Sequence, residues 1–210
     1  MIEMELPERQ EVVGWAQTAR SNSHVFRAST EEEASAVLRM ARQRGWTVSL
    51  RGEGNAYGDN TLNEGHIVLV LGDIDKISSW DPETGVLEAG AGVTIEQILL
   101  HAISDGWMLP AQPGTRKVSV GGAIANNVHG KNAFHAGYFG EHTLSIRCLL
   151  ASGEVVECSR TERADLFHGL ISGFGVLGIV LGARLQLRRV PSFYVTQRVV
   201  SCGSLPELFE

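Results

Sequence analysis

Apolar residues recur at helical spacing in the segment STEEEASAVLRMARQRG near the start of the chain. Thr30 is placed to N-cap this helix with Glu33 three residues later, and Gly45 is placed to end it in a left-handed conformation. Residues 46–50 then alternate as a short strand, and residues 66–71 (HIVLVL) form a continuous apolar run typical of a buried strand. The pattern predicts a helix and two strands around a polar loop, which is the beginning of a small α/β unit.

A second unit with the same kinds of pattern follows. Residues 81–85 predict a turn, residues 86–89 predict a strand, and Thr94 with Gln97 forms a capping box for the helix TIEQILLHAISDG. Later, TLSIRCLLASGEVVECS predicts a hairpin, ADLFHGLI predicts a helix, and residues 179–187 predict a strand. Because helices and strands alternate with hairpins among them, the pattern indicates an α+β fold.

The segment PAQPGTRKVSVGGAIANNVHGKNAFHAGYFGEH lies between these elements and shows little periodicity. Loops of this length inside a compact domain are usually functional or disordered. The segment has few charges and many small apolar residues, which argues against disorder. We therefore expect a loop that forms a binding surface.

Composition excludes several classes of protein. The 210 residues carry a formal net charge of −6, and no segment gathers enough Lys and Arg to bind a row of phosphates, so we expect no nucleic-acid partner. No apolar run approaches the length of a spanning helix and no signal peptide is recognisable, so we expect a cytoplasmic protein with no membrane span. The three cysteines and the histidines lack ligand spacing, so we expect neither a disulfide framework nor a metal site.

The segment GFGVLG matches the glycine spacing of the dinucleotide-binding fingerprint through Gly173, Gly175 and Gly178. In that fingerprint a strand comes first and a helix follows, because the helix N-terminus binds the pyrophosphate. Here the predicted helix comes first, and the acidic residue expected about 20 residues later is missing from a suitable strand end. These departures argue against a nicotinamide-binding Rossmann fold and favour a tight turn between a helix and a strand.

Two other glycine-rich segments are better candidates for a nucleotide. Gly52, Gly54 and Gly58 follow Arg51, and closely spaced glycines let backbone N–H groups converge on an anion. A glycine-rich turn without a ligand is the alternative. In GTRKVSVGGAIANNVHGKN, small residues would let a flat ring approach the backbone, and amide, imidazole and ammonium groups follow them. This segment is not a P-loop, because Ala125 stands where that motif has glycine.

Three motifs in order, RGEGNAYGD, PGTRKVSVGGAIANNVHGKN and DLFHGLISGFGVLGI, resemble the FAD-binding (PCMH-type) domain of the vanillyl-alcohol oxidase superfamily. Within it, the likeness is to decaprenylphosphoryl-ribose 2′-oxidases and to sugar and polyol oxidases. The resemblance implies a two-subdomain α+β fold over residues 1–190. A small α/β subdomain at about 20–78 and a larger mixed-sheet subdomain with flanking helices at 79–190 would hold FAD between them. Residues 191–210 would begin a truncated substrate domain.

The resemblance also implies roles for residues that match the family motifs. The loop from Gly52 to Gly58 would bind the FAD pyrophosphate, residues 114–122 would line the flavin and its ribityl chain, and Gly178 with Ile179 would meet the adenine side. Noncovalent FAD is implied, because Asn55 stands where covalent relatives have a histidine. The implied cofactor-binding residues are Arg51, Gly52, Glu53, Gly54, Asn55, Ala56, Tyr57, Gly58, Pro113, Gly114, Thr115, Val118, Gly121, Gly122, Ala125, Asn126, His129, Gly130, Asn132, Gly178 and Ile179.

His129 and Lys131, in the motif HGKN, are the implied catalytic residues beside the isoalloxazine and the substrate pocket. A cation at Lys131 would favour the reduced, anionic flavin, and a solvated loop lysine is the alternative. Tyr57 is either an ordinary loop aromatic or a cover for the flavin edge. No metal ion takes part in this interpretation.

The resemblance implies an enzyme that oxidises a CH–OH group of a sugar or polyol derivative by hydride transfer to the flavin. Members of the family continue into a substrate domain that supplies a catalytic lysine or another base, whereas this sequence ends at Glu210. We therefore expect a cofactor-binding half that is inactive by itself. Its implied partners are the substrate, the missing C-terminal domain and an NADH-dependent reductase that acts on the product. The alternatives are a flavin-binding module that does not catalyse alone and a nicotinamide dehydrogenase.

Overall fold

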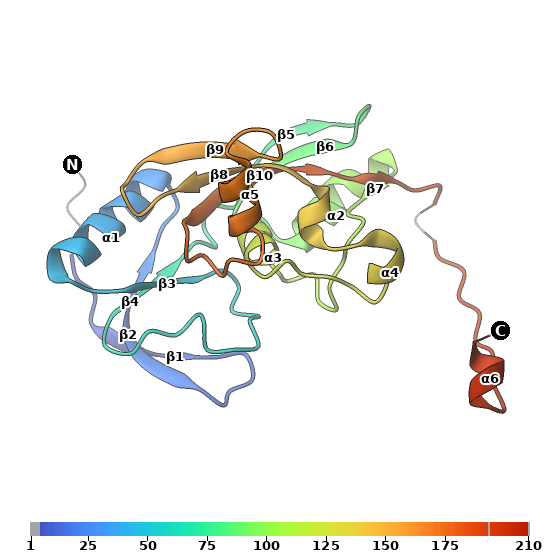
Figure 1. Cartoon of the computed structure of the whole chain (residues 1–210), viewed down its shortest axis with the longest axis horizontal. Coiled ribbons are helices and arrows are strands. Elements are labelled where there is room, and N and C mark those ends of the chain that lie inside the picture. Colours follow the sequence, from blue (N-terminus) through green and yellow to red (C-terminus); the bar gives the residue numbers. More distant parts are fainter. Residues whose placement is uncertain (1–4, 193, 210) are drawn as a thin grey trace.

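The first of two large sheets lies in the N-terminal part of the chain (Figure 1). The structure, a computed structural model, describes residues 5–192 and 194–209. The strand at one edge pairs antiparallel with its neighbour, whereas the other three strands run parallel to one another. In spatial order the sheet contains β1 (Arg9–Val13), β2 (Arg20–Arg27), β4 (Ile67–Val70) and β3 (Val48–Arg51).

Helix α1 (Glu31–Arg44) connects β2 to β3, and its predicted start and end are confirmed. The side chain of Thr30 accepts a hydrogen bond from the backbone N–H of Glu33 at 3.2 Å, and Gly45 ends the helix at φ +64°. Capping of this kind stabilises a helix by about 1 kcal/mol at each such site. The buried face of α1 packs against the first sheet through Ala34, Ala36, Val37, Met40 and Ala41.

The strands of this unit begin and end differently from the predicted ranges. The predicted strand at 46–50 starts two residues later, because the backbone N–H of Trp46 still donates to Ala41 at the end of α1. The predicted strand at 66–71 is shorter, because the N–H of His66 belongs to a turn that closes on Asn63. Strands β1 and β2 did not emerge from the sequence pattern at all.

The second sheet has five strands, and every neighbouring pair is antiparallel. The predicted hairpin is confirmed as β8 and β9, and the strand after GFGVLG is confirmed as β10. A further strand, β5, precedes the turn predicted at 81–85. In spatial order the sheet contains β5 (Ile77–Asp81), β6 (Val86–Gly90), β10 (Ile179–Gln186), β8 (Thr143–Leu149) and β9 (Val155–Ser159).

Helix α2 (Ile95–Ala102) carries the predicted capping box, in which Thr94 and Gln97 bond to each other's backbone N–H groups. The predicted helix continued to Gly106, and the structure has a 3-10 turn, η1 (Ile103–Asp105), in that place. Beyond it, β7 (Trp107–Met108) pairs with β11 (Arg188–Arg189).

The long segment that we predicted as a loop contains three short helical elements, so that prediction is wrong in part. They are α3 (Val120–Ala125), α4 (Ala133–Ala136) and the 3-10 helix η2 (Phe139–His142). Helix α3 is buried, with Val120, Ala123 and Ile124 in the core of the second sheet. Its consecutive glycines lower helix propensity, which hides this helix from a reading of local pattern.

One hydrophobic core joins the two sheets. Phe26, Ile67 and Leu69 of the first sheet form a cluster with α1, and this cluster also includes Leu149 of β8 and Ile179 of β10. On the surface above it, Glu31 of α1 forms an ion pair with Arg147 of β8 at 2.5 Å, and Arg42 donates to the carbonyl of Ala151. The hairpin therefore packs against α1 as well as within its own sheet.

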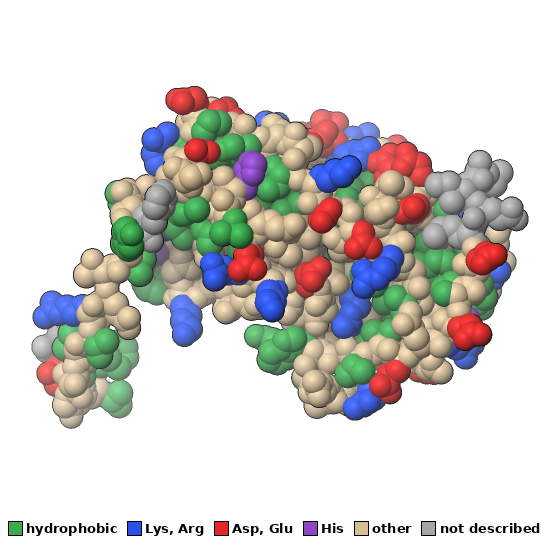
Figure 2. Space-filling view, turned by 180° about the vertical axis from the view of Figure 1, so that it is seen from behind, with side chains coloured by type: hydrophobic (Ala, Val, Ile, Leu, Met, Phe, Trp, Pro, Cys, Tyr) green, Lys and Arg blue, Asp and Glu red, His purple; other side chains and the backbone are tan. Residues whose placement is uncertain are grey.

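The C-terminal residues run away from both sheets in Figure 1 and end in the short helix α6 (Leu205–Leu208). No helix among the described residues is long and apolar enough to cross a membrane, and no group of three metal-ligating side chains occurs among them. On the face shown in Figure 2, basic and acidic side chains are interspersed. The two sheets with their helices confirm the predicted α+β class. The predicted boundary between the subdomains at residue 78 and the predicted end of the domain at residue 190 stay predictions.

Candidate functional site

A cavity of about 850 Å³ is bounded by elements of both sheets, and its size is typical of a site for a large organic cofactor. Residues 51–57, after β3, form one wall. Residues 113–115 and 117–119 form a second wall, which continues along one side of helix α3 to His129. The loop between α5 (Ala164–Leu170) and β10 forms a third wall through Phe174 and Gly175.

The loop after β3 approaches the start of α3 very closely. A Cβ atom at Gly52 would collide with the Ser119 hydroxyl in its present position, so glycine allows this close approach. The side-chain amide of Asn55 donates to the carbonyl of Lys117 at 2.9 Å and ties the loop to the second wall. These contacts form a backbone-lined cradle at the position that the sequence predicted for the pyrophosphate.

Arg51 supports this loop from inside the protein. Its guanidinium donates to the Thr61 hydroxyl and to the Val13 carbonyl, both at 3.1 Å. Burial lowers the pKa of Arg51, but an arginine stays protonated at any ordinary pH. Since two of its donors already bond to protein oxygens, Arg51 acts as a brace for the loop and adds positive charge to the cavity.

The first turn of α3 has its own partners within the protein. The backbone N–H of Val120 donates to Val93 at 2.8 Å, that of Gly121 donates to Ala91 at 2.8 Å, and that of Gly122 faces the Ser119 hydroxyl at 3.4 Å. A helix start binds an anion through free N–H groups. Because these groups already have partners within the protein, the start of α3 offers no free N–H group of its first turn to an anion.

The wall that begins with α3 ends at an exposed imidazole. Asn126 donates its side-chain amide to the carbonyl of Gly122 at 2.9 Å, and Asn127 adopts φ +43° and accepts from Gly140. After this turn, His129 lies at the cavity with its ring edge-on to Tyr138, at a centroid distance of 5.2 Å. This end of the cavity is open to solvent.

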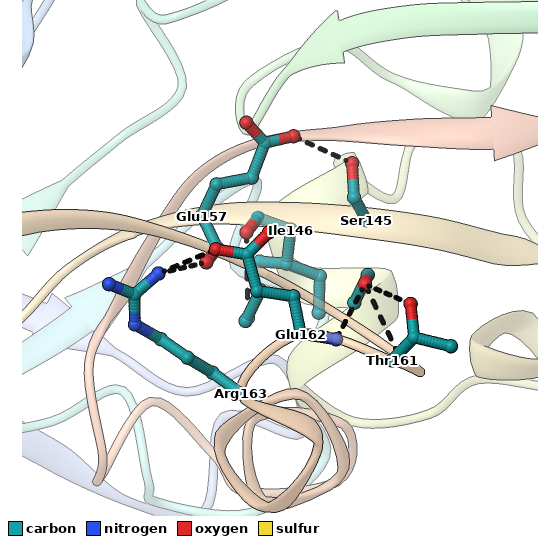
Figure 3. A network of polar contacts seen from close by, with 8 residues as sticks. Ser145, Ile146, Glu157, Thr161, Glu162 and Arg163 are labelled. Carbon is teal, nitrogen blue, oxygen red and sulfur yellow. Dashed lines mark hydrogen bonds and ion pairs between the residues drawn. The ribbon is translucent and has the colours of Figure 1, made fainter.

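The GFGVLG turn is positioned from two sides. Arg163, just before α5, bonds to the carbonyl of Glu157 on β9 and to the Glu162 carboxylate, which fixes the start of that helix on the hairpin (Figure 3). After the helix, the N–H groups of Ser172 and Phe174 donate to Ile124 and Ala125 of α3 at 3.1 and 3.0 Å. The helix precedes the glycines and β10 follows them, so the order is opposite to that of a Rossmann fingerprint.

Most of the predicted cofactor-binding residues lie in the cavity wall. Their contact with FAD stays a prediction, because no ligand is present to test it. The residues in the wall are Arg51, Gly52, Glu53, Gly54, Asn55, Ala56, Tyr57, Pro113, Gly114, Thr115, Val118, Gly121, Gly122, Ala125, Asn126 and His129.

Six predicted residues lie outside this wall. Gly58 and Lys131 are exposed to solvent and do not line the cavity. Gly130 turns back against the carbonyl of Gln112, and Asn132 donates to the Pro110 carbonyl at 3.0 Å, so both brace the HGKN turn from behind. Gly178 is buried against Leu149, and the Ile179 side chain is in the shared core, so neither residue lines the cavity. The next residue, Val180, does line it.

The structure also brings residues to the cavity that were not among the predicted site residues. Trp15 reaches it from the turn between β1 and β2 and packs on Tyr57 at a centroid distance of 4.8 Å. Nothing local marks Trp15, since it comes from a distant element. Of the other additional wall residues, Leu50, Asn60, Thr61, Leu71, Ala91 and Val180 lie outside the glycine-rich motifs, whereas Lys117, Ser119, Val128, Phe174 and Gly175 lie within them.

The chemistry of these walls fits a flavin dinucleotide. The glycine-rich loop at Gly52 is of the kind that binds a diphosphate through backbone N–H groups, and Leu71, Ala91 and Val180 add a buried apolar part to the wall. The open end has His129 beside it, where a substrate could meet a redox ring. Such a ring must be accessible, whereas an adenine can be enclosed.

Comparisons with known proteins agree with this interpretation. The model of the family described as FAD binding domain matches residues 23–159. A decaprenylphosphoryl-beta-D-ribose oxidase of Mycolicibacterium smegmatis is 37% identical over 198 residues, which are 93% of this chain and 43% of the relative. A D-arabinono-1,4-lactone oxidase of Yarrowia lipolytica is 30% identical over 91% of this chain and 37% of the relative.

A solved structure, that of 6-hydroxy-D-nicotine oxidase from Arthrobacter nicotinovorans, has the same fold. The TM-score is 0.74 at 24% identity, over 80% of this chain and 37% of that one. The chain thus spans less than half the length of each of these relatives. The cavity, the motifs and the family match lead to one conclusion: the chain belongs to the FAD binding domain family of the vanillyl-alcohol oxidase superfamily, and FAD is its cofactor.

Proposed function

We propose that this chain is the FAD-binding half of an oxidoreductase that oxidises a CH–OH group of a sugar or polyol derivative. The observation that carries the proposal is a cavity with a glycine cradle in its wall and an exposed histidine at its open end. The names of the two relatives support the substrate class, because one is a ribose oxidase and the other a lactone oxidase.

Bound FAD supplies a two-electron acceptor for the hydride of the carbinol carbon. In the proposal, the loop at 52–58 holds the diphosphate noncovalently, with Asn55 where a covalent flavin would need a nucleophilic side chain. Ala125 and Asn126 line the path toward the open end. These residues bind and orient, and the substrate proton has to go to a base near the open end.

His129 is the residue of this chain best placed to contact a substrate. Its ring lies at the exposed end of the cavity and is held edge-on by Tyr138. We assign it the positioning of the substrate hydroxyl by a hydrogen bond. Lys131, two residues further on, is exposed and lies outside the cavity wall, and in the proposal its ammonium group adds positive charge near the open end.

The proposal includes a substrate-binding region that these 210 residues do not contain. That region would supply the catalytic base and close the open end of the cavity. Without it, the chain binds FAD and turns over slowly. The electrons would leave the flavin to an acceptor outside this domain, and a reductase that uses NADH would act on the oxidised product. The three free cysteines fit a reducing compartment, in line with the cytoplasmic location that we propose.

The test is reduction of the bound flavin without oxygen. The chain and the whole protein that contains it are loaded with FAD and mixed with sugars, polyols, sugar lactols and, as a contrast, 2-hydroxy acids. We expect the flavin absorbance near 450 nm to bleach with sugar or polyol derivatives, fastest in the whole protein. A His129→Ala variant should raise KM more than it lowers kcat, because it loses a positioning contact.

A flavin-binding module without catalysis is the second candidate function. It is favoured by the share of the relatives' length that this chain covers. No bleaching of the whole protein by any member of the panel, with FAD fully bound, would support the module and contradict the proposed oxidation. Release of the flavin by acid precipitation checks the noncovalent assignment.

A further inference from the structure

Asn127 adopts a left-handed backbone just after α3, with φ +43°. Its N–H donates to the Ile124 carbonyl, and the next N–H, that of Val128, donates to the Ala123 carbonyl, both at 3.0 Å. These two bonds form a Schellman motif, in which the left-handed position takes glycine and sometimes asparagine. Since glycine would satisfy the backbone alone, the presence of asparagine indicates a use for its side chain.

The side chain of Asn127 has a partner in another element. Its Oδ1 accepts a hydrogen bond at 2.9 Å from the N–H of Gly140 in the 3-10 helix η2. A second bond joins the same two segments, because the N–H of Phe139 donates to the Val128 carbonyl at 2.9 Å. The 3-10 helix is itself fixed, since Phe139 lies in the core of the second sheet and Arg160 donates to the Gly140 carbonyl at 3.0 Å. Asn127 therefore ties the end of α3 to an anchored element.

The position of His129 depends on this junction. His129 comes two residues after Asn127, and Tyr138, whose ring lies edge-on to the imidazole at 5.2 Å, comes two residues before Gly140. Within the part of the chain that the structure describes, no hydrogen bond holds the exposed His129 ring. Its direction is set by the backbone on which it stands and by the tyrosine beside it.

We propose that Asn127 is a positioning residue that keeps His129 against Tyr138 and so orients the imidazole at the cavity. The inference rests on the substrate contact proposed for His129. Asn127 lies outside the cavity wall, so it acts through His129 and touches neither cofactor nor substrate. A ring that is oriented before the substrate arrives loses less conformational freedom on binding.

Two variants separate the side chain of Asn127 from its backbone conformation. Asn127→Gly keeps the left-handed turn and loses the acceptor, whereas Asn127→Asp keeps an acceptor oxygen for the N–H of Gly140. Flavin reduction by sugars and polyols is measured without oxygen in the whole protein loaded with FAD. We expect Asn127→Gly to raise KM about threefold to tenfold with little change in kcat, because one orienting hydrogen bond is lost. Asn127→Asp should stay near the wild type.

A double variant tests whether Asn127 acts through His129. Once His129→Ala has removed the imidazole, adding Asn127→Gly should not raise KM further. The matched control is Gln17→Gly, which removes an exposed side chain from another left-handed position, at φ +58°, outside the cavity wall. KM should be unchanged in that variant.

The position of the ring is also measured in this chain itself, without a substrate. Proton NMR signals of the His129 ring, assigned with His129→Ala, should be displaced by the ring current of Tyr138, and Tyr138→Leu gives their value without that ring. Asn127→Gly should move the signals toward this value, and Asn127→Asp should not. The melting temperature of Asn127→Gly should stay close to that of the wild type, because glycine is favoured at a left-handed helix end.

Four results would overturn the proposal. They are unchanged His129 signals in Asn127→Gly, a wild-type KM in Asn127→Gly where His129→Ala raises it, effects of the two changes that add in the double variant, and an effect of Asn127→Asp as large as that of Asn127→Gly. If His129→Ala leaves KM unchanged while Asn127→Gly still displaces the ring signals, the proposed substrate contact fails and the orientation of the ring by Asn127 stands.

Discussion

Two glycine-rich loops border the cavity, and they are built in different ways. The loop at 52–58 follows a parallel strand, and side chains anchor it through Arg51 and Asn55. The loop at 172–178 joins a helix to an antiparallel strand and is held by backbone hydrogen bonds to α3. Both loops line the cavity, and we propose only the first as a cradle for an anion. Similar glycine content thus goes with two different ways of fixing a loop at the same cavity.

The largest expected effect is a loss of FAD affinity when Gly52 in the first loop is replaced. In Gly52→Ala the new methyl group collides with the Ser119 hydroxyl, so either this hydroxyl turns away from the N–H of Gly122 or the loop moves. We expect FAD affinity to fall about 10-fold to 100-fold, since overpacking of this kind costs about 1 to 3 kcal/mol. Fluorescence titration with FAD measures it.

Gly58→Ala is the matched control in the same loop. The nearest atom to a Cβ at that position is Asn60 Oδ1 at 3.6 Å, which is ordinary contact, and Gly58 lies outside the cavity wall. FAD affinity should therefore stay near that of the wild type. Equal affinities in Gly52→Ala and Gly58→Ala would show that the cradle does not bind the cofactor.

Next in size is the effect of Gly175→Ala in the second loop. The glycine has φ +78° and touches Leu50, so alanine adds both backbone strain and a clash. We expect the apoprotein to lose about 1 to 3 kcal/mol of unfolding free energy, measured by urea denaturation. Gly114→Ala, where a Cβ would meet open space, should be neutral. A loss of FAD affinity without a loss of stability in Gly175→Ala would contradict this difference between the loops.

A smaller effect should appear only at alkaline pH. Burial raises the pKa of the Cys158 thiol to about 12, and burial also raises the pKa of Cys148, whose sulfur lies 3.7 Å from where a Cβ of Gly178 would be. Unfolded thiols titrate near pH 8.5, so above that pH the unfolded chain binds fewer protons than the folded one. Stability should fall as pH rises from about 8.5 toward 12.

Denaturation of Cys158→Ala at a series of pH values checks this slope. The variant has lost the raised pKa, so its stability should depend less on pH above 8.5 than that of the wild type. Cys202→Ala, at an exposed thiol, should keep the wild-type dependence. If Cys158→Ala and the wild type lose stability in parallel, the buried thiols are not the cause.

The smallest effect concerns charge at the first loop. Lys117 lies in the cavity wall and has no acidic partner among the described residues. Lys117→Ala should weaken FAD binding about threefold at low ionic strength and less in salt, because an exposed charge is screened. Arg116→Ala is the comparison, since Arg116 pairs with Glu96 at 3.8 Å and lies outside the wall. An effect of Lys117→Ala that does not depend on salt would exclude a charge interaction.

The sequence predicted the elements whose signals are local. Helix α1, the capping box of α2 and the hairpin of β8 and β9 each carry caps, turns or alternation within a few residues. The glycine motifs also located most of the cavity wall. Side-chain pattern and turn residues are sufficient to predict an element when the residues that define it lie within a few positions of one another in the sequence.

The parts that the sequence missed depend on distant contacts. Strand β2 buries Ser21 and Ser23, whose hydroxyls lie 2.9 Å apart while Ser23 donates to the Asn63 carbonyl, so no apolar alternation marks that strand. Helix α3 contains two glycines, and its support comes from distant elements, because Gly121 packs closely on Ala91 and Val120, Ala123 and Ile124 are in the core of the second sheet. Trp15 and Phe174 reach the cavity only through the arrangement of whole elements.

The core shared by α1, β8 and β10 affects how the protein can be divided. Leu149 and Ile179 are buried in the cluster of the first sheet, although both belong to strands of the second. A fragment that ends near residue 78 would expose this apolar surface, and so would a chimera that exchanged only the first sheet. Each sheet completes part of the hydrophobic core of the other, so we expect the two walls of the cavity to unfold together.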